Sequence, residues 1–168
     1  MGATVKHLTV VRHAKSSWKH PGLADRDRPL NKRGARAAPM MGHRLADLGY
    51  RPELILSSPA TRALTTATVF AEALGCSPAD IEIDERIYGA GVAGLIRLVQ
   101  EVDDGVERVM LFGHNPDLTG LVNRLARVSL DNLPTCGVAQ LEFAFDTWAE
   151  LGSELAVRAE IDYPKKTS

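Results

Sequence analysis

Residues 8–13 read Leu-Thr-Val-Val-Arg-His, a short apolar run that ends abruptly in an arginine and a histidine. Two further runs have the same character: Leu-Ile-Leu-Ser at 54–57 and Arg-Val-Met-Leu-Phe at 108–112. Short apolar runs bounded by turn residues are typical of strands that are buried on both faces, as in a parallel sheet. These three segments therefore predict the central strands of a mostly parallel sheet.

Segments with the apolar period of a helix alternate with these strands. There are four of them, at residues 38–48, 63–74, 95–102 and 118–128. Gly49 and Gly75 follow the first two segments and are expected to end those helices. Pro39 lies inside the first segment, so we expect either a kink at this position or a late helix start.

The last part of the chain has the alternation of strands instead. Apolar residues alternate with polar or small ones over 139–145 and 155–161, and a glycine-containing loop at 146–153 separates the two runs. This pattern predicts an antiparallel hairpin at the sheet edge. The whole chain is therefore expected to be one α/β domain over residues 1–168. We predict a three-layer sandwich: a mostly parallel central sheet with an antiparallel edge strand and helices on both faces.

Composition excludes several classes of protein. The 20 Lys and Arg residues and 21 Asp and Glu residues give a net charge of −1, whereas dedicated nucleic-acid binders are usually basic. No stretch approaches the ~20 apolar residues that cross a bilayer, and residues 1–7 lack the apolar region of a signal peptide. Cys76 and Cys136 lie far apart, as is typical of reduced core thiols. We expect a cytoplasmic protein with no membrane contact.

Arginine and histidine recur where the predicted strands end. Arg12 and His13 follow the first strand, Arg62 follows the second, and His114 follows the strand at 108–112. Parallel strands would bring these four side chains to one edge of the sheet, where α/β proteins bind their ligands. The planar guanidinium groups of the arginines suit phosphate oxygens, and a neutral histidine can act as a nucleophile.

Two of these junctions also carry the signals of a helix start. Ser58 precedes Pro59, and Asn115 precedes Pro116, so in each pair we expect an N-cap followed by proline at the first helical position. The free N–H groups of a helix N-terminus favour anions. The combination predicts a site for a tetrahedral oxyanion, most simply phosphate.

Four motifs resemble those of the histidine phosphatase superfamily, the phosphoglycerate mutase-like proteins. They are the run at 8–13, the S-x-x-x-R-A-x-x-T-A pattern at 58–67, Gly-His-Asn-Pro at 113–116, and Arg-Pro-Leu-Asn at 28–31 with Gly34. The matches occur in the family's order and cover residues 7–145. The resemblance implies a phosphoglycerate mutase-like fold. It also implies that His13 attacks phosphorus and forms a phosphohistidine intermediate, while Arg12, Arg62 and His114 hold the phosphoryl oxygens.

Within that superfamily, the Arg-His-Ala-Lys-Ser sequence at 12–16 is most similar to SixA-like phosphohistidine phosphatases. Residues 75–108 are too few to add the helical lid of the mutases, so we expect an open, shallow pocket that suits a phosphorylated protein side chain. The sequence departs from the mutases at Ala14 and Lys15, which replace Gly-Glu, and at Lys19, which follows Trp18 where Asn is expected. Mutase-type substrate contacts are therefore not expected. We call Arg12, His13, Arg62 and His114 the clamp. The other residues expected to contact substrate are Lys15, Ser16, Lys19 and Arg28.

The general acid is less well defined by the sequence. The superfamily carries a Glu or Asp near the place of Asp84 and Glu85, and we favour Glu85 as the acid. Asp84 and Glu85 could instead be solvated surface charges, and Asp25 and Asp27 are alternative acids from the loop before Arg28. A phosphohistidine substrate reduces the need for an acid, because its imidazole leaving group is protonated near neutral pH.

No metal or cofactor is expected, because His7, His20 and His43 have no partners at ligand spacing and are interpreted as surface residues. A locally basic stretch is either a solvated loop and helix start or a positive rim that attracts an acidic or phosphorylated protein. That stretch consists of Arg26, Arg28, Lys32, Arg33 and Arg36.

The preferred interpretation is a monomeric phosphatase of protein phosphohistidine. A phosphatase of small phosphorylated metabolites would use the same chemistry in a different pocket. An inactive phosphate-binding module is a third alternative, although the presence of both histidines and both arginines counts against it.

Overall fold

A six-stranded sheet forms the centre of the computed structural model, which describes residues 5–166. The strand order across the sheet is β3-β2-β4-β1-β5-β6. The strands are β1 (Lys6–Arg12), β2 (Leu54–Ser57), β3 (Glu82–Ile83), β4 (Arg108–Gly113), β5 (Val138–Phe143) and β6 (Arg158–Asp162).

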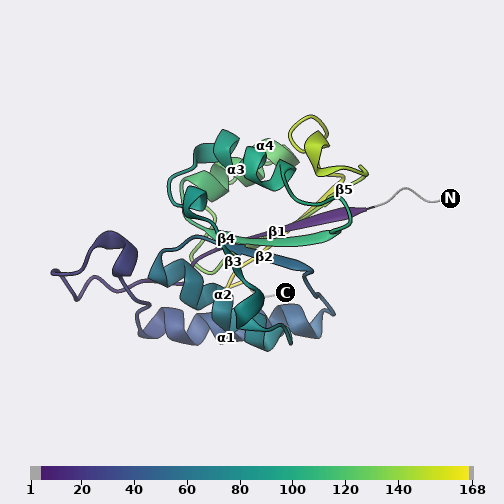
Figure 1. Cartoon of the computed structure of the whole chain (residues 1–168). Coiled ribbons are helices and arrows are strands. Elements are labelled where there is room, and N and C mark those ends of the chain that lie inside the picture. The colour runs from purple at the N-terminus through teal and green to yellow at the C-terminus, as the bar shows by residue number, and fades with distance from the viewer. Residues whose placement is uncertain (1–4, 167–168) are drawn as a thin grey trace.

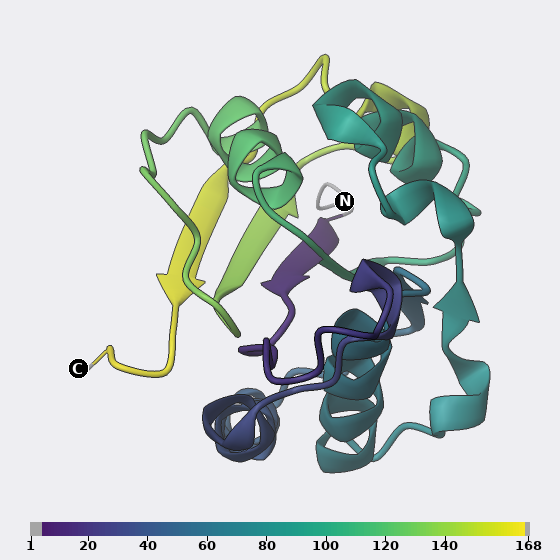
Figure 2. The same ribbon diagram turned by 90° about the vertical axis from the view of Figure 1, so that its left-hand side faces the viewer.

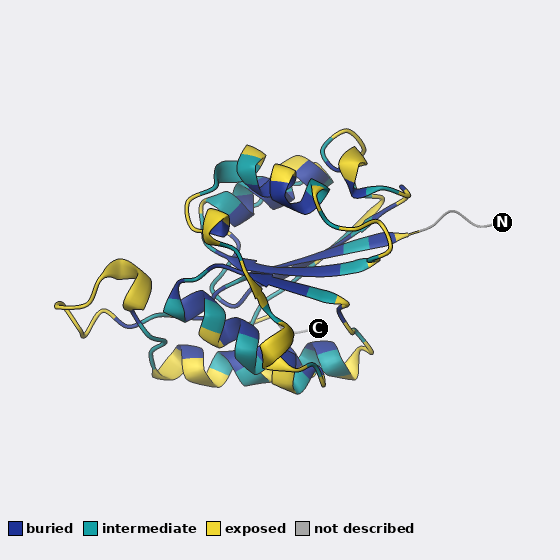
Figure 3. Cartoon of the chain, viewed as in Figure 1, coloured by how far each residue is buried: buried dark blue, intermediate teal, exposed yellow. Residues whose placement is uncertain are grey.

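The first four strands are parallel to one another, whereas β5 pairs antiparallel with both β1 and β6. The predicted mostly parallel sheet with a hairpin at its edge is therefore confirmed. One detail differs, because the antiparallel strand β5 lies second from the edge and β6 forms the edge itself. The three apolar runs of the sequence are the neighbouring strands β2, β4 and β1, and most of their residues are buried (Figure 3).

Helices cover both faces of the sheet, which confirms the three-layer sandwich (Figure 1). α1 (Lys32–Asp47) and α2 (Thr61–Ala73) lie on one face, and α3 (Gly91–Gln100) and α4 (Asp117–Ala126) lie on the other. Short 3-10 helices lie in the connections: η1 (Asp25–Asp27), η2 (Pro78–Asp80), η3 (Glu85–Ile87) and η4 (Trp148–Glu150).

Each face of the sheet has its own hydrophobic core. Leu8 and Val10 of β1 belong to the core beneath α3 and α4, whereas Val11 belongs to the core beneath α1 and α2, together with Met41 and Phe70. Full burial of such a side chain stabilises the fold by roughly 1.5–3 kcal/mol. Packing on both faces fixes the central strands, and thereby fixes the loops that follow them.

The start of α1 differs from the sequence prediction. The helix begins at Lys32 rather than near Ala38, and the side-chain oxygen of Asn31 caps it by accepting a hydrogen bond from the N–H of Gly34 at 2.8 Å. The helix continues through Pro39, so the alternative of a late start is wrong. Its first turns are polar and exposed, and therefore carry no apolar period that could reveal them.

The start of α2 is a second correction. The helix begins at Thr61 with Ala60 at the N-cap, so the predicted cap at Ser58 and first helical position at Pro59 are wrong. Ser58 instead accepts a hydrogen bond from the N–H of Ala60 at 3.1 Å and closes a turn before the helix.

The start of α4 is close to the prediction but displaced by one residue. Pro116 occupies the N-cap, and the helix begins at Asp117. The side chain of Asn115 nevertheless caps the helix, because its oxygen accepts a hydrogen bond from the N–H of Thr119 at 3.1 Å.

In the described part of the chain, no helix is long and apolar enough to cross a bilayer. Both cysteines are free, but only Cys136 is buried, whereas Cys76 is half-buried and is not the full core residue that was expected. The prediction about a signal peptide depends on residues 1–7, of which 1–4 lie outside the described residues.

Candidate active site

Three loops meet where the parallel strands end, and the segment between β1 and α1 projects beyond this edge (Figures 1 and 2). Backbone hydrogen bonds join the loops: the N–H of His13 donates to the carbonyl of Gly113 at 3.1 Å, and that of Ser58 donates to Phe112 at 3.1 Å. The strand ends therefore position the histidine-bearing loops directly against each other, as the parallel topology predicted.

A pocket of about 440 Å³ opens at this edge of the sheet. It brings together all four predicted clamp residues and three of the four other predicted contacts. Its lining consists of Arg12, His13, Lys15, Ser16, Trp18, Arg28, Arg62, His114, Asn115 and Thr135.

His13 is buried and is held by the backbone. Its Nδ1–H donates to the carbonyl of Ala14 at 2.7 Å, and the N–H of Ala14 donates to the hydroxyl of Thr66 at 3.0 Å. Burial, together with the charges of Arg62 and Arg12, lowers the pKa of His13 to about 4, against the opposing effect of the Ala14 hydrogen bond. His13 is therefore neutral at pH 7, with its proton on Nδ1 and a lone pair on Nε2.

His114 lies beside His13, with ring centroids 5.2 Å apart and planes tilted by 54°. Its Nε2 is 2.8 Å from the hydroxyl oxygen of Ser58, and the ring of Tyr88 packs edge-on against it at 5.4 Å. Burial, with repulsion from the protonated form of His13 and from Arg62, lowers the pKa of His114 to about 3. If the Ser58 hydroxyl donates to Nε2, the proton of neutral His114 is on Nδ1.

The two clamp arginines are held by backbone oxygens. Arg12 donates to the carbonyl of Leu133 at 2.9 Å, and Arg62 donates to the carbonyl of Asp25 at 2.7 Å. Three buried side-chain nitrogens at this site have no protein partner within the described residues: Nε of Arg12, Nε of Arg62 and Nδ1 of His114. The two arginine nitrogens are donors, and Nδ1 of His114 is a third in the tautomer in which Ser58 donates to Nε2. Unpaired buried donors call for an explanation, and their gathering around one pocket indicates a site for an anion.

Asp25 is a shared acceptor at the pocket rim. Arg62 donates to its Oδ2 at 2.9 Å, Arg28 donates to its Oδ1 at 3.2 Å, and the hydroxyl of Tyr88 also donates to Oδ2. The hydrogen bond from Tyr88, followed by those from Arg62 and Arg28, holds the pKa of Asp25 well below its usual range. Asp25, predicted only as an alternative acid, is thus an ionised carboxylate that fixes two arginines.

Like Asp25, the other three predicted acids are not part of the pocket lining. Glu85 has a side chain that is 72% exposed and forms an ion pair with Arg26 at 3.0 Å. Asp84 pairs with Arg86 at 2.8 Å, and the hydrogen bond from this arginine lowers its pKa. Asp27 is exposed.

Of the other residues predicted to contact substrate, three line the pocket and one does not. Lys15 is exposed and lines the pocket, and Ser16 accepts a hydrogen bond from Arg28 at 2.8 Å. Arg28 is itself buried and lies over the ring of Trp18, with 3.6 Å between its Cζ and the ring centroid. Lys19 is exposed and is not part of the pocket lining.

Sequence reasoning did not identify Trp18, Tyr88 or Thr135 as parts of this site. Trp18 is 77% exposed yet lines the pocket. Its position two residues after the Arg-His-Ala-Lys-Ser sequence was a signal that could have placed it in the site. Tyr88 and Thr135 reach the site through loops that carry no motif, so nothing in their sequence neighbourhood marks them.

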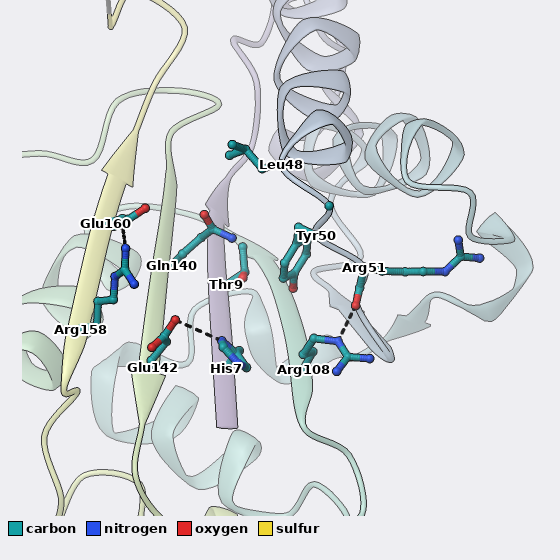
Figure 4. Close-up of a pocket in the computed structure, with 11 residues that line it drawn as sticks. His7, Thr9, Leu48, Tyr50, Arg51, Arg108, Gln140, Glu142, Arg158 and Glu160 are labelled. Atoms are coloured by element: carbon teal, nitrogen blue, oxygen red, sulfur yellow. Dashed lines mark hydrogen bonds and ion pairs between the residues drawn. The ribbon is translucent and has the colours of Figure 1, made fainter. Parts of the chain in front are cut away.

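A second hollow of about 540 Å³ lies at the opposite edge of the sheet, near the start of β1 and β4 (Figure 4). Its charged side chains largely interact with one another or with the backbone. His7 lies 3.9 Å from Glu142, and Arg158 pairs with Glu160 at 2.6 Å. This hollow lacks the paired histidines and buried arginines of the first pocket. We therefore treat the first pocket as the candidate active site.

Metal ligands are not grouped in this part of the molecule or elsewhere in residues 5–166. No three His, Cys, Asp or Glu side chains in that range are placed together as a metal site requires.

Comparison with known proteins agrees with this geometry. Residues 8–90 match the model of the histidine phosphatase superfamily (branch 1). An uncharacterized protein of Mycobacterium tuberculosis is 33% identical over 165 residues, which cover 92% of this chain and 100% of that protein.

Two solved structures are similar over most of the chain. The structure named as the phosphohistidine phosphatase SixA of Agrobacterium tumefaciens is 32% identical, with a TM-score of 0.72, and the match covers 81% of this chain and 91% of that one. The structure named as SixA of Nakamurella multipartitia has a TM-score of 0.83 over 99% of this chain and 100% of that one. At 24% identity, the second similarity supports the fold alone.

Proposed function

The chain belongs to the histidine phosphatase superfamily, and we propose that it hydrolyses phosphohistidine on a protein. The proposal rests on the pocket that combines two neutral histidines with buried Arg62 and half-buried Arg12. The similarity to a structure named as a phosphohistidine phosphatase supports the same substrate class.

In the first step, His13 is the nucleophile. Its Nε2 lone pair attacks phosphorus, the new N–P bond forms, and the P–N bond of the substrate breaks with its electron pair going to the leaving imidazole. The Ala14 carbonyl, 2.7 Å from Nδ1, stabilises the positive charge that the ring acquires. Arg12 and Arg62 neutralise the non-bridging oxygens, which is where phosphoryl transfer needs most stabilisation, and neutral His114 donates a hydrogen bond to them from Nδ1.

In the second step, water attacks the phosphorus of phospho-His13. The P–N bond breaks, its electrons return to Nε2, and phosphate leaves while the proton of the water passes to phosphate or solvent. His13 is restored in its neutral form, in agreement with a pKa of about 4.

The state of the nearby carboxylates favours phosphohistidine over an alcohol phosphate. Asp25 and Asp84 are held ionised by their hydrogen bonds, and Glu85 is ion-paired at the surface. An alkoxide leaving group requires a proton donor in the site, whereas the imidazole of phosphohistidine accepts its proton from solvent near neutral pH. This observation carries the choice of substrate.

Neither a metal nor a cofactor is needed in this mechanism, and we propose that the enzyme acts without one. The two arginines supply the charge neutralisation that a divalent cation would otherwise give. Location in the cytoplasm and a monomeric state remain predictions from the sequence.

The test is phosphate release from a phosphohistidine peptide, a phosphoserine peptide and a panel of sugar phosphates, with EDTA present. We expect release from phosphohistidine, and its loss in His13→Ala. Faster release from a sugar phosphate would instead assign the protein to small-metabolite hydrolysis. No release from any substrate by folded protein would favour a phosphate-binding module, and inhibition by EDTA would contradict the metal-free mechanism.

A further inference from the structure

A shallow groove of about 340 Å³ adjoins the candidate active site. It shares Lys15 and Thr135 with the lining of the catalytic pocket, so the two hollows are neighbours on one surface. We call it the basic groove. Its lining consists of Lys15, Arg33, Arg36, Ala37, Met40, Thr135, Pro164 and Lys165.

The charge of the basic groove has one sign. Lys15, Arg33, Arg36 and Lys165 line it, and no carboxylate does. All four side chains are exposed, and among residues 5–166 none of them forms an ion pair. Four unpaired cations in one hollow repel one another, which is unusual for a chain with a net charge of −1.

The structure divides the basic stretch of the sequence into two parts. Arg26 pairs with Glu85, and Arg28 is buried in the catalytic pocket beside Asp25, so neither lines the basic groove. Arg33 and Arg36 lie one turn apart on α1 and point to the groove together with Met40, which follows one turn later. Only the α1 part of the stretch can therefore serve as a positive rim.

The groove is fixed relative to the catalytic histidine. The N–H of Asn31 donates to the carbonyl of Lys15 at 2.9 Å, which joins the start of α1 to the loop that carries His13. A Cβ atom on Gly34 would lie only 2.2 Å from the same carbonyl oxygen, so helix and loop are in close contact. A partner seated on α1 would thus be held in register with the catalytic pocket.

The apolar part of the groove lining suits a protein rather than a free anion. Met40 is 41% exposed, and Ala37 and Pro164 add further apolar surface to the same lining. Interfaces between proteins combine an apolar centre with a charged rim of complementary sign. The occupant best matched to this surface is an acidic protein face with a small apolar contact.

We propose that the basic groove docks the acidic surface that surrounds the phosphorylated histidine of the substrate protein. The inference rests on the proposed function, and it adds the means by which the substrate protein is recognised. The cations attract the acidic surface, and α1 orients it so that the phosphohistidine enters the neighbouring pocket.

The test compares two phosphohistidine peptides of equal length, one flanked by Asp and Glu and one flanked by Ser and Gln. At about 20 mM salt we expect kcat/KM of wild type to be about tenfold higher or more for the acidic peptide, and the advantage to disappear at about 0.5 M salt. Arg33→Glu/Arg36→Glu should lose the advantage, yet hydrolyse free phosphohistidine at the wild-type rate.

The matched control is Arg97→Glu/Arg124→Glu, which makes the same change of charge on exposed arginines of α3 and α4. This control should keep the preference for the acidic peptide. Loss of the preference in both double variants, or its retention in Arg33→Glu/Arg36→Glu, would overturn the proposal, as would the absence of any preference in wild type.

A binding measurement separates this inference from the proposed function. Both peptides are prepared with glutamine in place of phosphohistidine, and their affinity is followed by fluorescence anisotropy. Tighter binding of the acidic peptide, lost in Arg33→Glu/Arg36→Glu, would support the groove even if phosphohistidine were not hydrolysed. Equal binding of both peptides, or tighter binding of a single-stranded oligonucleotide of the same charge, would refute it.

Discussion

Nδ1 of His13 lies 2.7 Å from the carbonyl oxygen of Ala14, the residue that follows it. A carbonyl can only accept, so this contact places a proton on Nδ1 and leaves Nε2 as the nucleophilic nitrogen. Burial keeps the ring neutral, and the backbone fixes its orientation. In the mechanism we propose, the histidine is therefore oriented for attack before any substrate binds.

The neutral state of His13 predicts a loss of stability in acid. The pKa of His13 is about 4 in the folded protein against 6.5 for the free side chain, so between these pH values the unfolded chain binds more protons. Stability should therefore fall as pH drops below 6.5, by about 2 kcal/mol at pH 5 from this residue. Urea unfolding of wild type and His13→Gln at pH 7 and pH 5 measures it.

The variant should lose about 2 kcal/mol less than wild type over this interval. His114→Gln serves as a parallel case, since the pKa of His114 is also lowered, to about 3. An identical pH dependence in wild type and His13→Gln would show that His13 is not buried in its neutral form.

Arg62 gives a prediction about geometry. It donates both to the carbonyl and to the carboxylate of Asp25, which fixes the guanidinium beside the pocket. Arg62→Ala should lower kcat by about 10²–10³, as the loss of one transition-state donor does. Arg62→Lys should remain within about threefold of Arg62→Ala, because a single ammonium cannot reproduce the paired contacts of the guanidinium.

Steady-state kinetics on phosphohistidine peptide check this prediction, with Arg97→Ala as the exposed control. Activity of Arg62→Lys near that of wild type would mean that charge alone matters and that the fixed orientation does not.

The clamp residues were predictable because they lie at strand ends. Parallel strands that are buried on both faces are readable from their apolar runs, and topology then brings Arg12, His13, Arg62 and His114 to one edge. The hydrogen bonds that Asp25 accepts from Arg62 and from Tyr88 were not predicted. Asp25 and Tyr88 lie in the connections between the main helices and strands. No periodicity encodes the course of such loops.

The helix starts were likewise harder to predict from the sequence than the apolar faces of the helices. The apolar stripe of α1 is readable from Ala38 onward, but its first turn is polar and depends on the cap at Asn31. At α2, proline after serine suggested a cap, yet the turn closed by Ser58 precedes the helix instead. Local hydrogen bonds decide where both helices begin. Many different sequences can form such hydrogen bonds, so the sequence alone does not reveal the boundary.

Gly34 gives a prediction that connects the fold with the site. A Cβ atom at this position would lie 2.2 Å from the backbone oxygen of Lys15 and 2.9 Å from its nitrogen. Backbone atoms cannot move aside cheaply, so Gly34→Ala must displace either α1 or the loop that carries His13. We expect a loss of about 1–3 kcal/mol of stability.

We also expect kcat to fall about tenfold or more, because small displacements of a catalytic group are costly. Urea unfolding and hydrolysis of phosphohistidine peptide provide the two measurements. Gly22→Ala is the control, since a Cβ atom there would meet nothing within 4 Å. Wild-type activity in Gly34→Ala would separate the helix packing from the geometry of the site.

The last prediction concerns Glu85, which the sequence favoured as the general acid. Its carboxylate is exposed and paired with Arg26 at 3.0 Å, and an imidazole leaving group needs little help from an acid. Glu85→Gln should therefore change kcat on phosphohistidine peptide by less than about twofold. Glu160→Gln is the matched control, since Glu160 forms a similarly exposed pair with Arg158 at the far edge of the sheet. A drop of about tenfold or more, confined to Glu85→Gln, would restore Glu85 as the acid. The mechanism would then need a proton donor that swings from Arg26 to the leaving group, and phosphate esters would return as plausible substrates.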